Sequence, residues 1–181
     1  KSHQESVKWY RLAADQGHAV AQNNLGIAYQ KGRGVTQNYH EAIKWFQKAA
    51  GQGNALAQYN YGLAYQKGLG VPQAEKEAAK WLQKAANQGV VEAQLNLALL
   101  DRTGHGVSPD LSEAVKWYRK AADQGNIEAQ YNLGIAYGEG QGVTKSAQEA
   151  FPWFLKAAQK GHAEAQFKVA LAYAQGDGTT P

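Results

Sequence analysis

The sequence predicts an all-α fold, a solenoid of antiparallel helix pairs with about ten helices. The main observation is a period of 36 residues that runs through the 181-residue chain without an insertion. Tryptophan recurs at this interval, at Trp9, Trp45, Trp81, Trp117 and Trp153. An Ala-Gln pair and a Gly-x-Gly element recur in the same register. Because every unit has the same length, each can stack on its neighbours in one geometry, as in a solenoid.

Each period carries two helical patterns. The first-type pattern contains the Ala-Gln pair, as in EAQYNLGIAY at residues 128–137, with Leu133 and Tyr137 one turn apart. The second-type pattern contains the tryptophan, as in EAVKWYRKAA at residues 113–122, with an apolar stripe opposite a basic face. Glycine recurs inside the first-type pattern at Gly26, Gly62 and Gly134. Since glycine costs a helix about 1 kcal/mol relative to alanine, this recurrence indicates close packing against a neighbouring helix.

Capping residues predict where the helices begin and end. Four polar residues precede a glutamate by three positions, which predicts a reciprocal capping box at the start of the second-type helices: Ser2, Asn38, Asp110 and Ser146. Ala74 lacks the capping side chain in the third unit. A glycine follows each second-type pattern, where a left-handed residue closes a helix: Gly17, Gly53, Gly89, Gly125 and Gly161. Asn54 and Asn126 can cap the next first-type helix, and Val90 cannot.

Pro152 interrupts the last second-type pattern. It lies six residues after the cap Ser146, beyond the first turn in which a missing amide is harmless. We therefore expect a late start or a kink over residues 148–152.

The composition excludes several classes of protein. The chain has no cysteine, which removes disulfides, thiolate metal sites and cysteine nucleophiles. A net charge of +4 is too small and too dispersed to predict nucleic-acid binding. No apolar run approaches the roughly 20 residues that a transmembrane helix needs.

The repeat pattern resembles a known family. Residues 128–137, the element GQGV at residues 140–143 and EAVKWYRKAADQG at residues 113–125 are similar to the Sel-one-like repeat (SLR), a relative of the tetratricopeptide repeat. Five in-register copies cover essentially the whole chain. One departure is Asp101, which stands where Tyr29, Tyr65 and Tyr137 stand in other repeats.

The resemblance implies a right-handed superhelix whose first-type helices line a concave face. It also implies a bacterial adaptor or scaffold for other proteins. A periplasmic or secreted location is favoured by the resemblance, and a cytoplasmic one stays open. The cysteine-rich branch of the family has disulfides in its repeats, which this chain lacks, so an enzymatic role of that branch gains no support here.

Candidate sites of chemistry have simpler explanations. The recurring glutamates match capping boxes, and His40-Glu41 lacks the second histidine of a zinc-protease motif because Lys44 stands in its place. The Gly-x-Gly loops close helices and follow no strand, unlike a dinucleotide-binding loop. The asparagines after the Ala-Gln pairs are expected to be structural, although an amide ladder could also bond a peptide backbone. We therefore predict no catalytic residue, no cofactor and no metal site.

The predicted partner-binding surface is the concave face. Tetratricopeptide-type geometry selects the residue after each Gln and the residue four positions onward, and these positions are almost all apolar or aromatic: Asn23, Ile27, Tyr59, Leu63, Leu95, Leu99, Tyr131, Ile135, Phe167 and Leu171. Charged residues flank this row, with Lys31, Lys67 and Arg102 toward one end and Glu139 toward the other. A solvated face of a monomer would not need such a stripe. The alternative is that tight curvature buries part of it against neighbouring repeats.

The sequence thus predicts a non-catalytic scaffold that binds a protein or peptide in the concave groove. Two alternatives stay open: a cell-wall (peptidoglycan) accessory or hydrolase-like protein, which a turnover assay on peptidoglycan fragments would reveal, and a structural spacer, which would capture no partner. We expect one solenoid domain over residues 1–181 within a longer chain. Its parts are a second-type helix at 2–16, repeats at 18–53, 54–89, 90–125 and 126–161, and an incomplete repeat at 162–181. Such open ends predict fraying or self-association.

Overall fold

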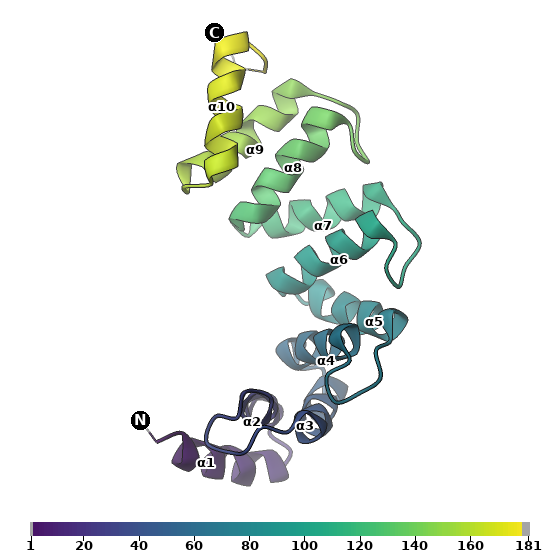
Figure 1. The fold of residues 1–181 in the computed structure, drawn as a ribbon, viewed down its shortest axis with the longest axis vertical. Coiled ribbons are helices and arrows are strands. Elements are labelled where there is room, and N and C mark those ends of the chain that lie inside the picture. Colours follow the sequence, from purple (N-terminus) through teal and green to yellow (C-terminus); the bar gives the residue numbers. More distant parts are fainter. Residues whose placement is uncertain (1, 179–181) are drawn as a thin grey trace. The chain divides into compact units, whose positions relative to one another are not determined.

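The computed structural model describes residues 2–178, and this part of the chain contains ten α-helices and no strand (Figure 1). Every helix has 13 residues. Their bounds are α1 His3–Asp15, α2 Ala19–Lys31, α3 Tyr39–Gly51, α4 Ala55–Lys67, α5 Glu75–Asn87, α6 Val91–Thr103, α7 Leu111–Asp123, α8 Ile127–Glu139, α9 Ala147–Gln159 and α10 Ala163–Gln175. The predicted all-α repeat architecture is confirmed. Residues 1 and 179–181 of the predicted array lie outside the described residues.

The helices fall into two compact units, one up to Ala93 and one from Gln94 onward. In the first unit each helix from α2 to α5 packs on the helix before it, and in the second unit α8, α9 and α10 do the same. The even-numbered helices are of the first type and the odd-numbered ones of the second type. Each unit is therefore a stack of alternating helix types.

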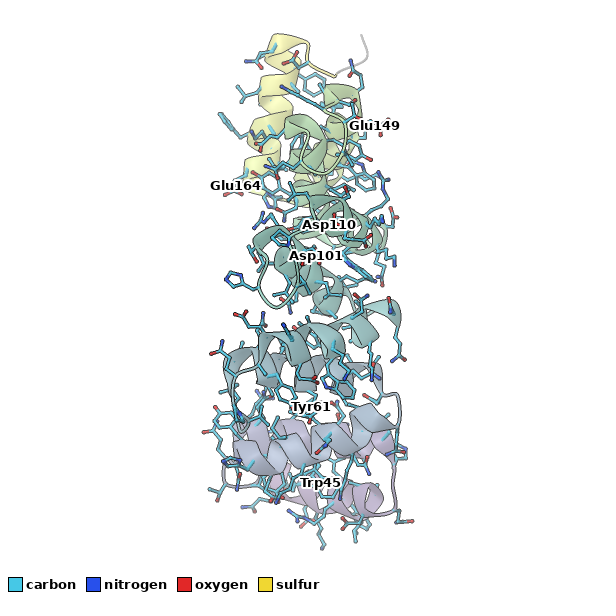
Figure 2. The ribbon with its side chains drawn as sticks, turned by 90° about the vertical axis from the view of Figure 1, so that its right-hand side faces the viewer. Trp45, Tyr61, Asp101, Asp110, Glu149 and Glu164 are labelled. Atoms are coloured by element: carbon cyan, nitrogen blue, oxygen red, sulfur yellow. The ribbon has the colours of Figure 1, made fainter. Side chains whose placement is uncertain are left out.

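The tryptophan row is largely core. Trp45, Trp117 and Trp153 are at most 8% exposed, whereas Trp9 is 65% exposed. Trp45 packs with Leu25 and Ala28 of the preceding first-type helix, and Figure 2 shows it lying among the helices of the first unit. From Trp45 onward, the lysine three residues after each tryptophan places its ammonium group over the indole ring, 3.9–4.3 Å from the ring centroid. The W-x-x-K spacing therefore covers the outer face of each indole.

The mid-helix glycines mark close helix contacts, as predicted. A Cβ at Gly26 would lie 2.6 Å from the Phe46 ring, and one at Gly134 would lie 2.6 Å from the Phe154 ring. At Gly62 the nearest atoms belong to Leu82, at 3.0 Å. Each of these glycines lets a large side chain of the next helix pack directly on the first-type helix backbone.

The predicted N-caps are confirmed, but the box is not reciprocal. Ser2, Asn38, Asp110 and Ser146 accept the amide of the glutamate three residues later, and Ala74 makes no such bond. The backbone amide of the cap is already engaged, because it donates to the carbonyl nine residues earlier, as from Asn38 to Tyr29 at 2.9 Å and from Ser146 to Tyr137 at 2.8 Å. Two of the glutamates pair instead with the lysine three residues later, Glu41 with Lys44 at 2.5 Å and Glu113 with Lys116.

The expected late start of the last second-type helix is wrong. Helix α9 begins at Ala147, capped by Ser146, and has the same length as its equivalents, with Pro152 inside it. Two contacts hold its first turn: the Ala150 amide donates to the Ser146 carbonyl at 3.0 Å, and the loop at Gly178 lies against the backbone of Ala147 and Gln148. Cap and tertiary packing therefore outweigh the local cost of proline.

The glutamine of each Ala-Gln pair links the repeats. Its Nε2 donates to a carbonyl eight residues earlier, near the end of the preceding second-type helix, as from Gln22 to Ala14 at 3.0 Å. Its Oε1 accepts from a glutamine at the end of the second-type helix of the same repeat, as in Gln52 to Gln22 at 2.7 Å and Gln88 to Gln58 at 2.8 Å. Gln22 and Gln58 are 4% and 5% exposed, so these hydrogen bonds satisfy buried polar groups that would otherwise cost stability.

Lys160 breaks this chain of amides. It stands where Gln52, Gln88 and Gln124 stand, and its Nζ donates to the Gly125 carbonyl at 2.7 Å. The Oε1 atom of Gln130 is left buried without a hydrogen-bond partner among the described residues. A glutamine at this position can serve both acceptors, as Gln88 does with the Gly53 carbonyl and with Gln58.

We therefore expect Lys160→Gln to raise the free energy of unfolding by about 1–2 kcal/mol, the usual cost of an unsatisfied buried acceptor. Thermal unfolding followed by circular dichroism measures the change. Lys160→Ala is the control, since it removes the lysine without supplying a donor, and it should not stabilise. Equal stabilities of the glutamine and alanine variants would contradict this account.

Candidate partner-binding surface

The predicted surface residues lie on the first-type helices, in a set that we call the first-helix face. In the first unit it comprises Asn23 and Ile27 of α2 with Tyr59 and Leu63 of α4. In the second unit it comprises Leu95 and Leu99 of α6, Tyr131 and Ile135 of α8, and Phe167 and Leu171 of α10. The two parts belong to different units, so each is a separate candidate surface.

In the first unit the face is partly covered. Ile27, Tyr59 and Leu63 are partly exposed, and Lys31 and Lys67 are exposed at the ends of their helices. Asn23 is only 3% exposed. Its Oδ1 accepts from Asn60 Nδ2 at 2.9 Å. Asn23 therefore joins α2 to α4 inside the unit and offers no surface to a partner.

Two exposed apolar residues extend this face and were missed by the sequence analysis. Val20 is 52% and Leu56 is 55% exposed. They lie three residues before Asn23 and Tyr59, on the same side of their helices. Their i, i+3, i+7 spacing with Ile27 and Leu63 is the signal that could have identified them. The equivalent residues of the second unit, Glu128 and Glu164, are acidic.

In the second unit the face is more open. Phe167 is 64%, Leu99 41% and Leu171 36% exposed, while Leu95, Tyr131 and Ile135 are partly exposed. Four large apolar or aromatic side chains thus reach solvent along α8 and α10, which is more than a solvated helix surface needs.

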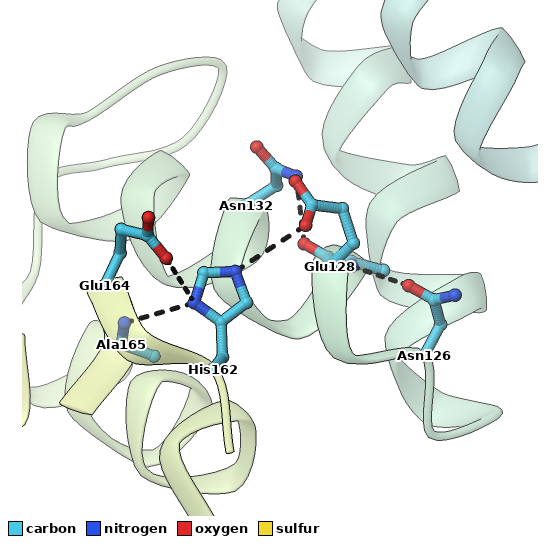
Figure 3. Close-up of polar contacts among 7 residues, drawn as sticks. Asn126, Glu128, Asn132, His162, Glu164 and Ala165 are labelled. Carbon is cyan, nitrogen blue, oxygen red and sulfur yellow. Dashed lines mark hydrogen bonds and ion pairs between the residues drawn. The ribbon is translucent and has the colours of Figure 1, made fainter. Parts of the chain in front are cut away.

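Tyr131 lies beside a polar cluster around His162, and Figure 3 shows this cluster. Its ring stacks on the His162 imidazole with centroids 4.4 Å apart. The imidazole caps α10, because its Nδ1 accepts the Ala165 amide at 3.2 Å. Glu128 and Glu164 flank the imidazole at 3.6 and 3.3 Å. Burial, followed by the charges of Glu164, Glu128 and Glu139, raises the pKa of Tyr131. Three carboxylates therefore give this face a negative potential.

The histidine caps are a second feature that the sequence analysis missed. His18 caps α2 through Nδ1 in the same way as His162, with the Ala21 amide at 3.2 Å. Asn54 and Asn126 cap α4 and α8, as predicted. Since a cap must present a lone pair, each ring keeps its proton on Nε2. The sequence signal that could have identified the histidine caps is that His18 and His162 stand at the same position of the repeat as Asn54 and Asn126.

Asp101 and Arg102 lie at the end of α6. Burial and the neighbouring charges of Glu113 and Asp110 raise the pKa of the Asp101 carboxyl. The backbone carbonyl of Asp101 accepts the Asp110 amide at 2.7 Å. The tyrosine carbonyls at this position of other repeats accept the equivalent amide. Asp101 and Asp110 are labelled in Figure 2. Replacement of tyrosine by Asp101 therefore leaves the backbone closure of the loop intact.

The asparagine row is mainly structural. Asn60 bonds Asn23. Asn132 donates to the Glu128 carbonyl at 2.9 Å and to its carboxylate at 3.2 Å.

Within residues 2–178, no group of three or more histidine, aspartate or glutamate side chains could hold a metal ion. None of the described helices is both long enough and apolar enough to cross a membrane.

Comparisons with known proteins agree with this architecture. A family model described as the Sel1 repeat matches residues 1–18, 19–54, 55–90, 91–126, 127–162 and 163–181. No curated protein sequence matches the chain.

Solved structures share the fold. A protective antigen from uropathogenic Escherichia coli strains, displaying an SLR fold, is 39% identical with a TM-score of 0.90, over 96% of this chain and 37% of that one. A Sel1 repeat protein from Oxalobacter formigenes is 37% identical with a TM-score of 0.88, over 97% and 75% of the two chains. An immunity protein from Pseudomonas aeruginosa is 26% identical with a TM-score of 0.54, over 89% and 58%.

The chain thus spans little more than a third of the length of the Escherichia coli protein. The repeat model, in contrast, accounts for every residue of the sequence. The 36-residue helix pairs, their glycine and tryptophan contacts and these matches together show that the chain belongs to the Sel1 repeat family.

Proposed function

We propose that this chain is a non-catalytic scaffold that binds a protein partner through the first-helix face of its units. Sel1 repeat proteins are in general non-catalytic repeat scaffolds for protein interactions. The observation that carries the proposal is the exposure of large apolar side chains on the first-type helices, above all Phe167 of the first-helix face and Leu56 beside it. A few anchor residues in a protein interface, most often aromatic ones, supply most of the free energy of binding.

The charges around the face differ between the units and support a choice of ligand. In the first unit, the exposed Lys31 and Lys67 follow the apolar residues and favour a ligand segment with acidic side chains. In the second unit, Glu128, Glu139 and Glu164 surround Tyr131 and favour a basic segment. Such complementarity affects mainly the rate and the specificity of association.

The test is quantitative capture of a partner by variants whose changes lie on exposed side chains. Leu56→Ser and Phe167→Ser should each weaken capture about tenfold or more, because an anchor is lost. Leu12→Ser is the matched control: Leu12 is 49% exposed but lies on the second-type helix α1. The partner is identified by mass spectrometry after a pull-down with the intact chain, and its affinity for each variant is then measured.

All three variants should unfold at nearly the parent temperature, since the side chains are exposed. If Leu56→Ser and Phe167→Ser bind the partner as tightly as Leu12→Ser does, the first-helix face is not the binding surface. Glu164→Lys should also slow association in a salt-dependent way.

A further inference from the structure

The charged residues of the first-type helices are segregated by sign between the two units. In the first unit, α2 and α4 each carry one charged residue, a lysine at the last position of the helix, Lys31 and Lys67. In the second unit, α8 carries two charged residues, Glu128 and Glu139, and α10 carries Glu164 and one lysine. The α2–α4 part of the first-helix face is therefore positive, and its α8–α10 part is negative.

These charges are exposed on inner helices as well as on outer ones. Lys31 and Lys67 are both exposed, and no described acidic side chain lies within ion-pair distance of either ammonium group. The Glu128 and Glu164 side chains are 63% and 69% exposed, although described helices precede and follow α8, and α10 is the last described helix. Their accessibility is therefore a property of the repeat and not of the ends of the array.

Helix stability does not explain this distribution. Glu139 lies at the end of α8, beside the negative end of the helix macrodipole, where a cation would be favourable and where the first unit has its lysines. No described basic side chain lies within ion-pair distance of its carboxylate. In the first unit, the exposed apolar residues Val20 and Leu56 occupy the first-turn position at which an acidic residue would stabilise the helix. The single sign of each part therefore indicates a role in binding another molecule.

We propose that the α2–α4 face of one molecule binds the α8–α10 face of a second copy of this chain. The proposal rests on the proposed function and names a second copy as the partner of both faces. The signs of the two faces are complementary. Their charges also have the same spacing, because Lys31 and Lys67 are one repeat apart and Glu128 and Glu164 are one repeat apart in the same fold.

The positions of the charges determine how the helices of the two copies run. The lysines end their helices and the glutamates lie in the first turn of theirs, so the charges meet only where the helices of the two copies are antiparallel. This arrangement places Tyr131 and Ile135 of one copy on the middle of the α2–α4 face of the other, where Ile27 and Leu63 are partly exposed. Each bound molecule keeps one free face of each sign, so the contact is heterologous and further copies can add.

The test is the oligomeric state of the purified intact chain, measured by sedimentation velocity over a wide range of protein concentration. At about 0.01 M salt, where the Debye length is about 30 Å, the average mass should rise with concentration beyond that of a dimer. At about 1 M salt, where the Debye length is about 3 Å, association should weaken about tenfold or more.

Charge reversal of either face should abolish association in low salt. The double variants are Lys31→Glu with Lys67→Glu and Glu128→Lys with Glu164→Lys, and each alone should stay monomeric at concentrations where the parent associates. An equimolar mixture of the two double variants should associate again, because each reversed face is complementary to a face of the other variant. Recovery in the mixture also shows that both variants are folded.

Lys8→Glu with Lys76→Glu is the matched control. It changes the net charge of the first unit by the same amount, but both lysines are exposed on second-type helices, α1 and α5. This control should associate as the parent does.

A chain that stays monomeric at every concentration in low salt would overturn the proposal, and so would a mixture of the double variants that stays monomeric. Association that persists unchanged in both double variants would place the contact elsewhere, as at the open ends of the array. A compact form that is independent of concentration would show that the two faces meet within one molecule, which also contradicts the proposal. The measurement needs no other protein, so a monomeric chain whose capture of a partner depends on Leu56 would refute self-recognition and leave the proposed function standing.

Discussion

Replacing Pro152 by alanine is expected to raise the free energy of unfolding by about 3 kcal/mol, the difference between the two residues inside a helix. The proline ring removes the hydrogen bond to the Gln148 carbonyl and crowds that carbonyl. Helix α9 nevertheless runs without interruption from Ala147 to Gln159, so the cost is borne by the packing of the second unit. Thermal unfolding by circular dichroism should show a midpoint higher by about 2–4 °C for each kcal/mol.

Pro152→Lys should stabilise slightly more than Pro152→Ala. Lysine stands at the equivalent position in other repeats and pairs with the glutamate three residues earlier, as Lys116 does with Glu113. The pair is exposed and worth a few tenths of a kcal/mol. Lys116→Ala is the control for that small term and should lower stability by no more than this. An unchanged or lower midpoint for both Pro152 variants would show that α9 tolerates proline without cost.

Replacing Gly70 by alanine is expected to destabilise the first unit by several kcal/mol, and by more than any surface change in this chain. Gly70 has a φ of +75°, and a Cβ there would lie 2.5 Å from the Tyr39 carbonyl oxygen and 2.6 Å from its carbon. Both atoms are backbone, so the clash is relieved only by moving the loop away from the start of α3. This displacement would also strain the closure of the preceding repeat.

Gly53→Ala provides a matched control for the conformational part of this effect. Gly53 has a φ of +88°, but no atom lies within 4 Å of a Cβ built there. Its replacement should cost about 1–2 kcal/mol, the penalty of a left-handed conformation alone. Denaturant unfolding of both variants measures the difference. If Gly70→Ala costs no more than Gly53→Ala, the close approach of the loop to Tyr39 is not what requires glycine.

The recurring residues of the sequence were interpreted correctly where their role is local. The capping positions Asn38 and Asn54 and the left-handed glycines such as Gly53 depend on backbone bonds within a few residues, and the structure confirms them. The family and the all-α repeat fold could also be predicted, since a constant period permits only one stacking geometry. The normal start of α9 at Ala147 could not be predicted, because contacts of α9 with its surroundings outweigh the local effect of Pro152.

The sequence by itself determined the repeat, its helix pairs and the positions at which a first-type helix can face a partner. Only the tertiary structure decided which of these positions stay accessible. Asn23 and Phe167 are equivalent in the repeat, yet one is 3% and the other 64% exposed. The reason is that exposure depends on the side chains contributed by neighbouring helices, which no single repeat encodes.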